Sequence, residues 1–266
     1  AGPLLAALLS LAPAARAQSI WLDRTEPRTV HVELAKPLFE GNGDGFLTFS
    51  GYFSTRLPLG ERLSFVGELP VATFRADSSS PFFDSTTRGN PYLGIESHPG
   101  TATGGWFELG VRAPLASDSE IATLSGLATD VDRWEAFIPD ALVLRAAGHW
   151  RADPRNGRIG ADFRAAPALW FPTGESGDIE LFTTYGAQIL FHDETARAGF
   201  GLGGRWLLTE GNDIGVSTTH QFEAAVDFLR GPVRPGMTLR IPLEDDGFFS
   251  RPVDAVVGVT LNLVLD

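Results

Sequence analysis

The chain has 266 residues, a formal net charge of −12 and no cysteine, which excludes a disulfide framework and every thiol-based nucleophile or metal site. Lys36 is the only lysine and no basic tract occurs, so we expect no nucleic-acid partner. The 30 glycines and 19 phenylalanines are typical of a glycine-punctuated, aromatic-rich β protein.

The N-terminal segment has the pattern of a secretory signal. Residues 3–15 form an apolar run that ends at Ala15-Arg16-Ala17, a small-x-small sequence before Gln18. The run is too short for a membrane-spanning helix, which needs about 20 residues, and no apolar run of that length follows. We predict a partial signal peptide over 1–17 and one domain over 18–266; the alternative for the first segment is an ordinary buried helix.

Period-two alternation of apolar and polar residues recurs along the rest of the chain and predicts about twelve strands. The predicted strands span 28–36, 46–57, 62–74, 90–97, 105–114, 141–151, 158–169, 178–191, 195–208, 216–229, 233–242 and 253–265. Short connections alternate with longer ones on the whole, as in bacterial membrane barrels with short periplasmic turns. The predicted fold class is therefore all-β, a single closed antiparallel transmembrane β-barrel of the outer membrane of a Gram-negative bacterium.

Two features are expected at the outer rim of this barrel. Pro70, Pro114 and Pro242 should mark strand ends or bulges there, because proline lacks the N–H group that a ladder needs. The long outer connection over 115–140 contains one helical insert, Ser119–Phe137, whose apolar residues recur at spacings of three and four. Ser117 or Asp118 is placed to cap this helix, and the insert either folds inward as a plug or lies over the rim.

The two faces of the predicted strands differ sharply, since one is apolar and the other carries charge. A charge in a dry interior costs several kcal/mol unless it is paired, so the charged face is expected to line a wet lumen. The alternative is a soluble barrel or sandwich with an apolar core. Opposite charges inside should form a ladder of ion pairs across the lumen. The predicted lumen-lining residues are Arg56, Glu68, Glu108, Arg112, Arg145, Arg151, Asp162, Arg164, Glu180, Arg197, Arg205, Glu223, Asp227 and Arg240.

Aromatic residues near the predicted strand ends are expected at the membrane interfaces, where amphipathic rings prefer to lie. These residues are Trp106, Trp150, Trp170, Phe171, Phe191 and Trp206.

Three motifs, Gly89-Asn-Pro-Tyr-Leu-Gly-Ile-Glu96, Glu108-Leu-Gly-Val-Arg-Ala-Pro114 and Arg234-Pro-Gly-Met-Thr-Leu-Arg-Ile-Pro242, carry a family resemblance. The chain resembles the group of outer-membrane barrels described as transporters of the phenol meta-degradation pathway, over most of its length. The resemblance implies passage of small molecules, aromatic compounds among them, through the outer membrane. It transfers no functional residue, because that group has few established ones.

The leading functional hypothesis is a narrow channel for passive uptake or efflux of small molecules that is not an enzyme and has no cofactor. Its partners would be outer-membrane lipid and the solute, and its oligomeric state is not assigned. One alternative is a lipid hydrolase or acyltransferase, with His149, His192 or His220 as base and Ser217 nearby. Another is a structural or ligand-binding β-barrel.

No metal site is expected. The acidic segments Glu40–Gly45 and Glu244–Asp246 contain the carboxylates that calcium prefers, but neither has the full spacing of an EF-hand loop. We interpret both as solvated turns.

Overall fold

The computed structural model describes residues 28–39, 48–75, 85–97, 103–116, 121–152, 158–174, 177–209, 218–244 and 253–265. The predicted signal peptide, the acidic segment 40–45, the two candidate caps and Ser217 lie outside these residues.

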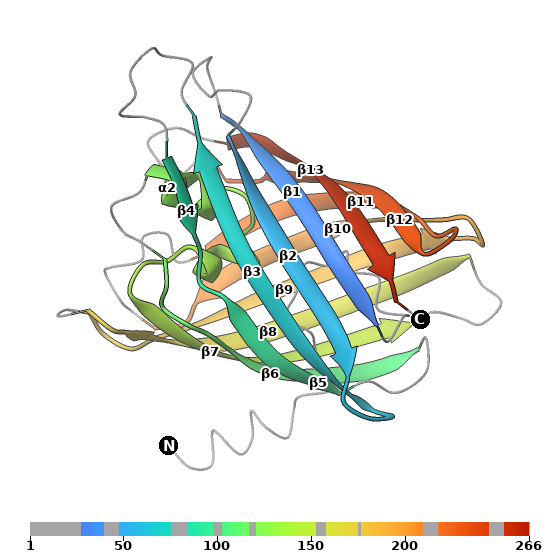
Figure 1. Ribbon diagram of the computed structural model, residues 1–266, viewed down its shortest axis with the longest axis horizontal. Helices are drawn as coiled ribbons and strands as arrows, with labels where there is room; N and C mark the ends of the chain where they lie inside the picture. The colour runs from blue at the N-terminus through green and yellow to red at the C-terminus, as the bar shows by residue number, and fades with distance from the viewer. Residues whose placement is uncertain are drawn as a thin grey trace.

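Thirteen antiparallel strands form the sheet, and two of them share one position beside a third, so the closed barrel has the predicted twelve strands around its circumference (Figure 1). The first and last strands pair from Thr29 opposite Val264 to Phe39 opposite Val253, so the sheet closes on itself. The strands are β1 (Thr29–Phe39), β2 (Phe49–Pro58), β3 (Leu63–Phe74), β4 (Ser85–Arg88), β5 (Tyr92–Ser97), β6 (Gly104–Arg112), β7 (Ala141–Ala152), β8 (Ile159–Pro172), β9 (Glu180–His192), β10 (Ala196–Leu207), β11 (Thr218–Phe228), β12 (Val233–Pro242) and β13 (Val253–Val264).

The short strand β4 was not predicted. Both β4 and β5 pair with β3, and the chain between them leaves the ladder at residues 89–91. Pro70 lies within β3, opposite this break, so of the two predicted positions it marks an irregularity of the ladder and not a strand end. The missing N–H group of Pro70 falls where the ladder is already interrupted, and only its carbonyl oxygen accepts a hydrogen bond there, from the N–H of Gly89 at 2.9 Å.

The alternation of side chains along the strands separates an apolar outer wall from a polar interior. On β3, Leu69 is 62% exposed whereas its neighbour Glu68 is 2% exposed, and the same contrast recurs around the barrel. A soluble protein has the reverse arrangement, with apolar residues enclosed. The outer wall therefore suits hydrocarbon, and the chain is placed in the outer membrane.

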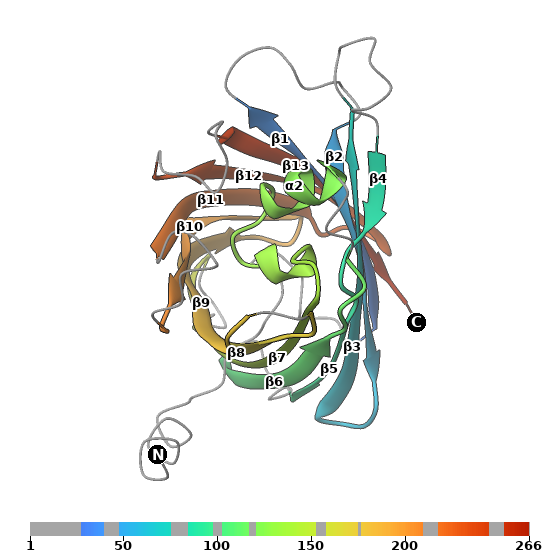
Figure 2. The ribbon, with the colours of Figure 1, turned by 90° about the vertical axis from the view of Figure 1, so that its left-hand side faces the viewer.

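The connection between β6 and β7 folds inward, and Figure 2 shows its helical turns within the ring of strands. The helix α2 (Ile121–Leu127) is shorter than predicted, and the 3₁₀ turn η2 (Trp134–Ala136) follows it. The helix stops because Asp130 forms a local turn: its carboxylate accepts the N–H of Asp132 at 2.9 Å, which competes with helical pairing. We call residues 121–138 the insert.

Two of the predicted interface aromatics lie inside the barrel instead. Trp106 is 4% exposed and packs edge-on against His149, with the ring centroids 5.0 Å apart. Trp170 packs against the apolar contacts of the insert. The prediction fails for both because closeness to a strand end does not determine the face; Trp106 alternates in phase with the buried Glu108.

No helix in the described part of the chain is long and apolar enough to cross a membrane.

The outer wall generates a depth-dependent prediction. Val259 lies on the outward face in the middle of β13 and is 52% exposed, whereas Val253 is half-buried at the end of the strand, opposite Phe39. An arginine at the bilayer midplane costs about 2–4 kcal/mol, against about 0–1 kcal/mol near the interface. We expect Val259→Arg to lower the free energy of unfolding in phospholipid vesicles much more than Val253→Arg does. Equal losses would contradict the assignment of this face to lipid.

Candidate functional site

The interior at the level of the insert is filled by buried charge. Of the predicted lumen-lining residues, all are buried except Arg197, which is half-buried. Whether they line a passage for solutes stays a prediction, since burial alone does not show transport.

Arg133 is the central charge of the insert and its side chain reaches three carboxylates. Its guanidinium donates to Glu33 on β1, to Glu68 on β3 at 3.3 Å and to Asp130 at 2.7 Å. The same group lies 3.6 Å from the ring centroid of Tyr52 on β2. Burial alone would lower the pKa of Arg133, but the carboxylates of Glu33 and Asp130 outweigh it and raise the pKa well above its ordinary value.

Acidic residues of the insert pair with arginines on the other side of the barrel. Glu135 binds Arg112 of β6 at 3.2 Å and Arg145 of β7 at 2.5 Å. Asp132 forms an ion pair with Arg164 of β8. The insert therefore contacts strands on both sides of the lumen through charge-assisted hydrogen bonds, which are the stronger class.

The charges of insert and wall are complementary. Three acids and one arginine of the insert face four arginines and two acids of the wall, so opposite net charges of equal size meet. Arg240 of β12 completes the set, because it pairs with Glu33 at 2.6 Å and lies 3.5 Å from Asp130. The full set is Asp130, Asp132, Arg133 and Glu135 from the insert with Glu33, Glu68, Arg112, Arg145, Arg164 and Arg240 from the wall.

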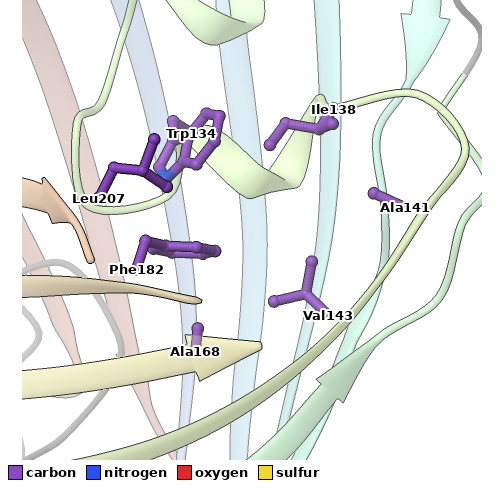
Figure 3. Packing of buried hydrophobic residues seen from close by; sticks show 7 residues of the cluster. All are labelled: Trp134, Ile138, Ala141, Val143, Ala168, Phe182 and Leu207. Atoms are coloured by element: carbon purple, nitrogen blue, oxygen red, sulfur yellow. The ribbon is translucent and has the colours of Figure 1, made fainter. Parts of the chain in front are cut away.

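The remaining contacts of the insert are apolar and aromatic. Trp134 packs edge-on against Phe182 of β9, with the centroids 5.2 Å apart, and Arg205 of β10 lies over the Trp134 ring at 3.9 Å. Figure 3 shows this cluster, in which Val143 and Leu207 also close around the insert. Because these contacts and the ion pairs come from strands around the circumference, the insert occupies the lumen at this level.

Asn90, in the break between β4 and β5, attaches the insert to the wall. Its side-chain amide donates to the carbonyl oxygens of Glu135 at 3.1 Å and Ile138 at 2.6 Å. Its amide oxygen accepts the N–H groups of Leu115 and Ala116 at 2.7 and 2.8 Å. One fully buried side chain therefore supplies hydrogen-bond partners to four backbone groups of the β6–β7 connection, which are not paired in the barrel sheet.

The neighbouring Gly89 is required by the same contact. A Cβ atom at this position would lie 2.3 Å from the carbonyl oxygen of Ala136, so only glycine lets the strand break approach the insert.

Below the insert, toward the ends that carry the termini, ion pairs run along the wall. Arg56 binds Glu96 at 3.2 Å, and Asp162 binds both Arg151 at 2.8 Å and His149 at 2.6 Å. The wall-to-wall pairs described here join strands that are adjacent or separated by one strand. The prediction of a ladder across the lumen is therefore wrong for them, and opposite walls are connected through the insert.

Sequence reasoning missed Glu33, Asn90 and the charged residues of the insert. Glu33 had a readable signal, because it alternates in phase with His31 on the buried face of β1. Asn90 had a weaker one, since Gly-Asn-Pro interrupts a strand. The charges of the insert follow its helical segment in a connection whose inward direction the sequence left open.

The histidines proposed as catalytic bases lie in three different places. His149 is buried in the interior beside Asp162, and His192 is at the opposite end of β9 from the insert. His220 lies on the outward face of β11 and binds Tyr185 and Glu244. Within the described residues, no group of three or more histidine, aspartate or glutamate side chains is arranged to hold a metal ion.

The ion-pair set generates a stability prediction. Replacing Arg133 by Met keeps the apolar stem and removes the charge that Glu33 and Glu68 share, and breaking a buried pair in this way costs about 3–5 kcal/mol. We expect this loss in urea unfolding of the folded barrel, together with protease cleavage within the insert. Arg133→Lys keeps the charge and should lose less. Unchanged stability of Arg133→Met would show that the insert is held by its apolar contacts alone.

Comparisons with known proteins give the fold its context. No family model matches the chain and no curated protein does, so the resemblance to the phenol meta-degradation group is not confirmed beyond an outer-membrane barrel. Among solved structures, LpxR from Salmonella typhimurium matches with a TM-score of 0.52 and 9% identity, over 89% of this chain and 100% of that chain. The CymD monoaromatic hydrocarbon channel matches with a TM-score of 0.48 and 10% identity, over 94% of this chain and 93% of that one.

One expectation is corrected by these comparisons. Barrels of the same fold include enzymes, LpxR among them, so the prediction that this chain is not an enzyme is contradicted. Barrel architecture alone does not separate channels from enzymes. What geometry and comparisons establish together is a closed twelve-stranded barrel of the outer membrane.

Proposed function

We propose that this chain is an outer-membrane channel for small molecules, and that the insert is a displaceable plug in its lumen. The observation that carries the proposal is the charge complementarity between the insert and the wall. Both surfaces are polar, so water can hydrate each of them after they separate.

The energetics favour a plug that moves. A buried ion pair gains little net free energy over its separated and hydrated partners, because the desolvation cost nearly cancels the attraction. The insert also has apolar contacts. Those of Trp134 are with β7 to β10, and those of Phe137 are with β2 and β3 on another side of the lumen. An interface of this kind supports two positions of the insert that differ by a few kcal/mol.

A polar interior also suits the passage of hydrophilic or weakly polar solutes. A barrel of twelve strands is wider than the eight-stranded barrels whose side chains fill the interior, and narrower than open porins of 16 to 18 strands. Removal of the insert would therefore leave a passage lined by charge, which selects solutes by sign as well as by size.

Loosening the plug should open the channel. Asn90→Ala removes four hydrogen bonds to the insert and its neighbouring loop without changing any charge. In planar lipid bilayers we expect wild-type protein to give brief, infrequent openings and Asn90→Ala to raise the open probability about tenfold or more, since losing these bonds costs more than 1.4 kcal/mol.

Asp193→Asn is the matched control, because Asp193 lies in an exposed turn and bonds only to residues of that turn. Its openings should equal those of the wild type. Bilayers in which neither the folded wild type nor Asn90→Ala carries current would overturn the channel proposal. Uptake of phenol and of a sugar of similar size by proteoliposomes would then define the solute class.

Ion selectivity tests which residues face the passage. Arg56 and Glu96 form an ion pair away from the insert, so each can be neutralised without disturbing the plug. Arg56→Gln removes a positive charge and should shift the reversal potential toward cation preference. Glu96→Gln should shift it toward anion preference. Shifts of the same sign, or none in either variant, would place this pair outside the conducting path.

A further inference from the structure

The outward face of the barrel carries one polar cluster that the proposed channel does not use. Tyr185 of β9, His220 of β11 and Glu244, two residues after β12, come together over Gly204 of β10. Apolar residues surround them on this face, among them Leu202, 56% exposed. A hydroxyl, an imidazole and a carboxylate on a lipid-facing wall carry a desolvation cost that three apolar side chains would not.

The hydrogen bonds set the role of each group. One carboxylate oxygen of Glu244 accepts from Nδ1 of His220, and the other accepts the backbone N–H of the same residue at 2.6 Å. A carboxylate can only accept, so the imidazole proton resides on Nδ1. In the neutral imidazole Nε2 carries the lone pair, and it accepts the Tyr185 hydroxyl at 2.7 Å.

Gly204 makes this approach possible. It is the residue opposite both Tyr185 and His220 in the two ladders. A Cβ atom at Gly204 would lie 2.9 Å from the Tyr185 hydroxyl oxygen, so the phenol ring can pack directly on the backbone only where this residue is glycine.

The cluster lies in the outer half of the strands that carry it. His220 is the third residue of β11, Glu244 follows the end of β12, and Tyr185 is in the same half of β9. With the chain termini on the periplasmic side, this end of the strands faces the outer leaflet. Trp206, 52% exposed on the neighbouring strand, is a residue type that prefers the same interfacial level.

We propose that Tyr185, His220 and Glu244 form a nucleophile, a base and an orienting acid that hydrolyse acyl esters of outer-leaflet lipids. The hydroxyl–imidazole–carboxylate order is the one that activates a weak nucleophile in acyl transfer. Access to the cluster is lateral, from the bilayer. The inference does not depend on the channel, because the lumen and this face are separated by the barrel wall.

The reaction balances with water as the only co-reactant. The Tyr185 oxygen attacks the ester carbonyl carbon while its proton passes to Nε2; the lipid alkoxide then leaves and takes that proton. The acyl group is now on Tyr185. Water gives a proton to Nε2 and its oxygen attacks the acyl carbon; the Tyr185 phenolate leaves and recovers the proton. The products are a fatty acid and a lipid with one chain fewer. A phenol, with a pKa near 10, is a better leaving group than an alcohol, which favours the second half.

The test uses the full chain folded into vesicles of defined lipid, with fatty-acid release measured by mass spectrometry. One set contains glycerophospholipid alone, and a second contains lipopolysaccharide as well. Release from the second set alone would identify lipopolysaccharide as the substrate, whereas equal release from both would identify glycerophospholipid. We expect Tyr185→Phe and His220→Asn to lower the rate about 10²- to 10⁴-fold, the usual contribution of general acid–base catalysis. His192→Gln, at the far end of β9, is the matched control and should retain the wild-type rate.

Two further readouts separate chemistry from a structural role. A slowly hydrolysed ester should leave an acyl mass on the peptide that contains Tyr185, and His220→Asn should abolish this mass. Gly204→Ala moves the phenol off the imidazole, so it should lower kcat with little change in KM. Folded wild type that releases no fatty acid from either lipid, or Tyr185→Phe with the wild-type rate, would overturn the proposal.

Discussion

The structure depends on one constraint: in hydrocarbon, every backbone N–H and C=O group must find a partner within the protein. The pairing of β1 with β13 meets it by closing the sheet. Once the sheet is closed, alternation leaves two environments for side chains, and the chain assigns its leucines and valines to one and its ionisable residues to the other. The polar interior is thus a consequence of closure, and whatever fills it must also be polar.

The insert meets that requirement with charge. An apolar plug against arginines and glutamates would strand them without water or partners, at a cost of several kcal/mol per charge. Arg133, Asp132 and Glu135 instead supply the partners that the wall lacks. The wall in turn adapts to the insert. The strand ladder is interrupted at Gly89 and Asn90, and Asn90 donates hydrogen bonds to the backbone of η2.

Local patterns predicted the parts of this structure that are local. The alternation of Leu69 with Glu68 identified the strands, their number and their two faces, because period two is a property of each strand by itself. The same alternation puts Trp106 in phase with the buried Glu108, but its closeness to a strand end led to the wrong prediction that it lies at the interface.

Contacts between distant residues were beyond the sequence. Arg133 and Glu33 are 100 residues apart, and no periodicity indicates that a loop returns into the lumen to join them. His220 stood out as a polar residue on an apolar face. Its partners are 35 and 24 residues away, on strands that meet it only after the register of β9, β10 and β11 is set.

Glu33 occupies a special place in how such a barrel is assembled. It lies on the first strand, which must find the last strand before the cylinder exists, and it accepts from both Arg133 and Arg240. Until β1 pairs with β13, Arg240 of β12 lacks this acceptor. Closure of the seam therefore completes the set of ion pairs around Glu33, one of which holds the insert.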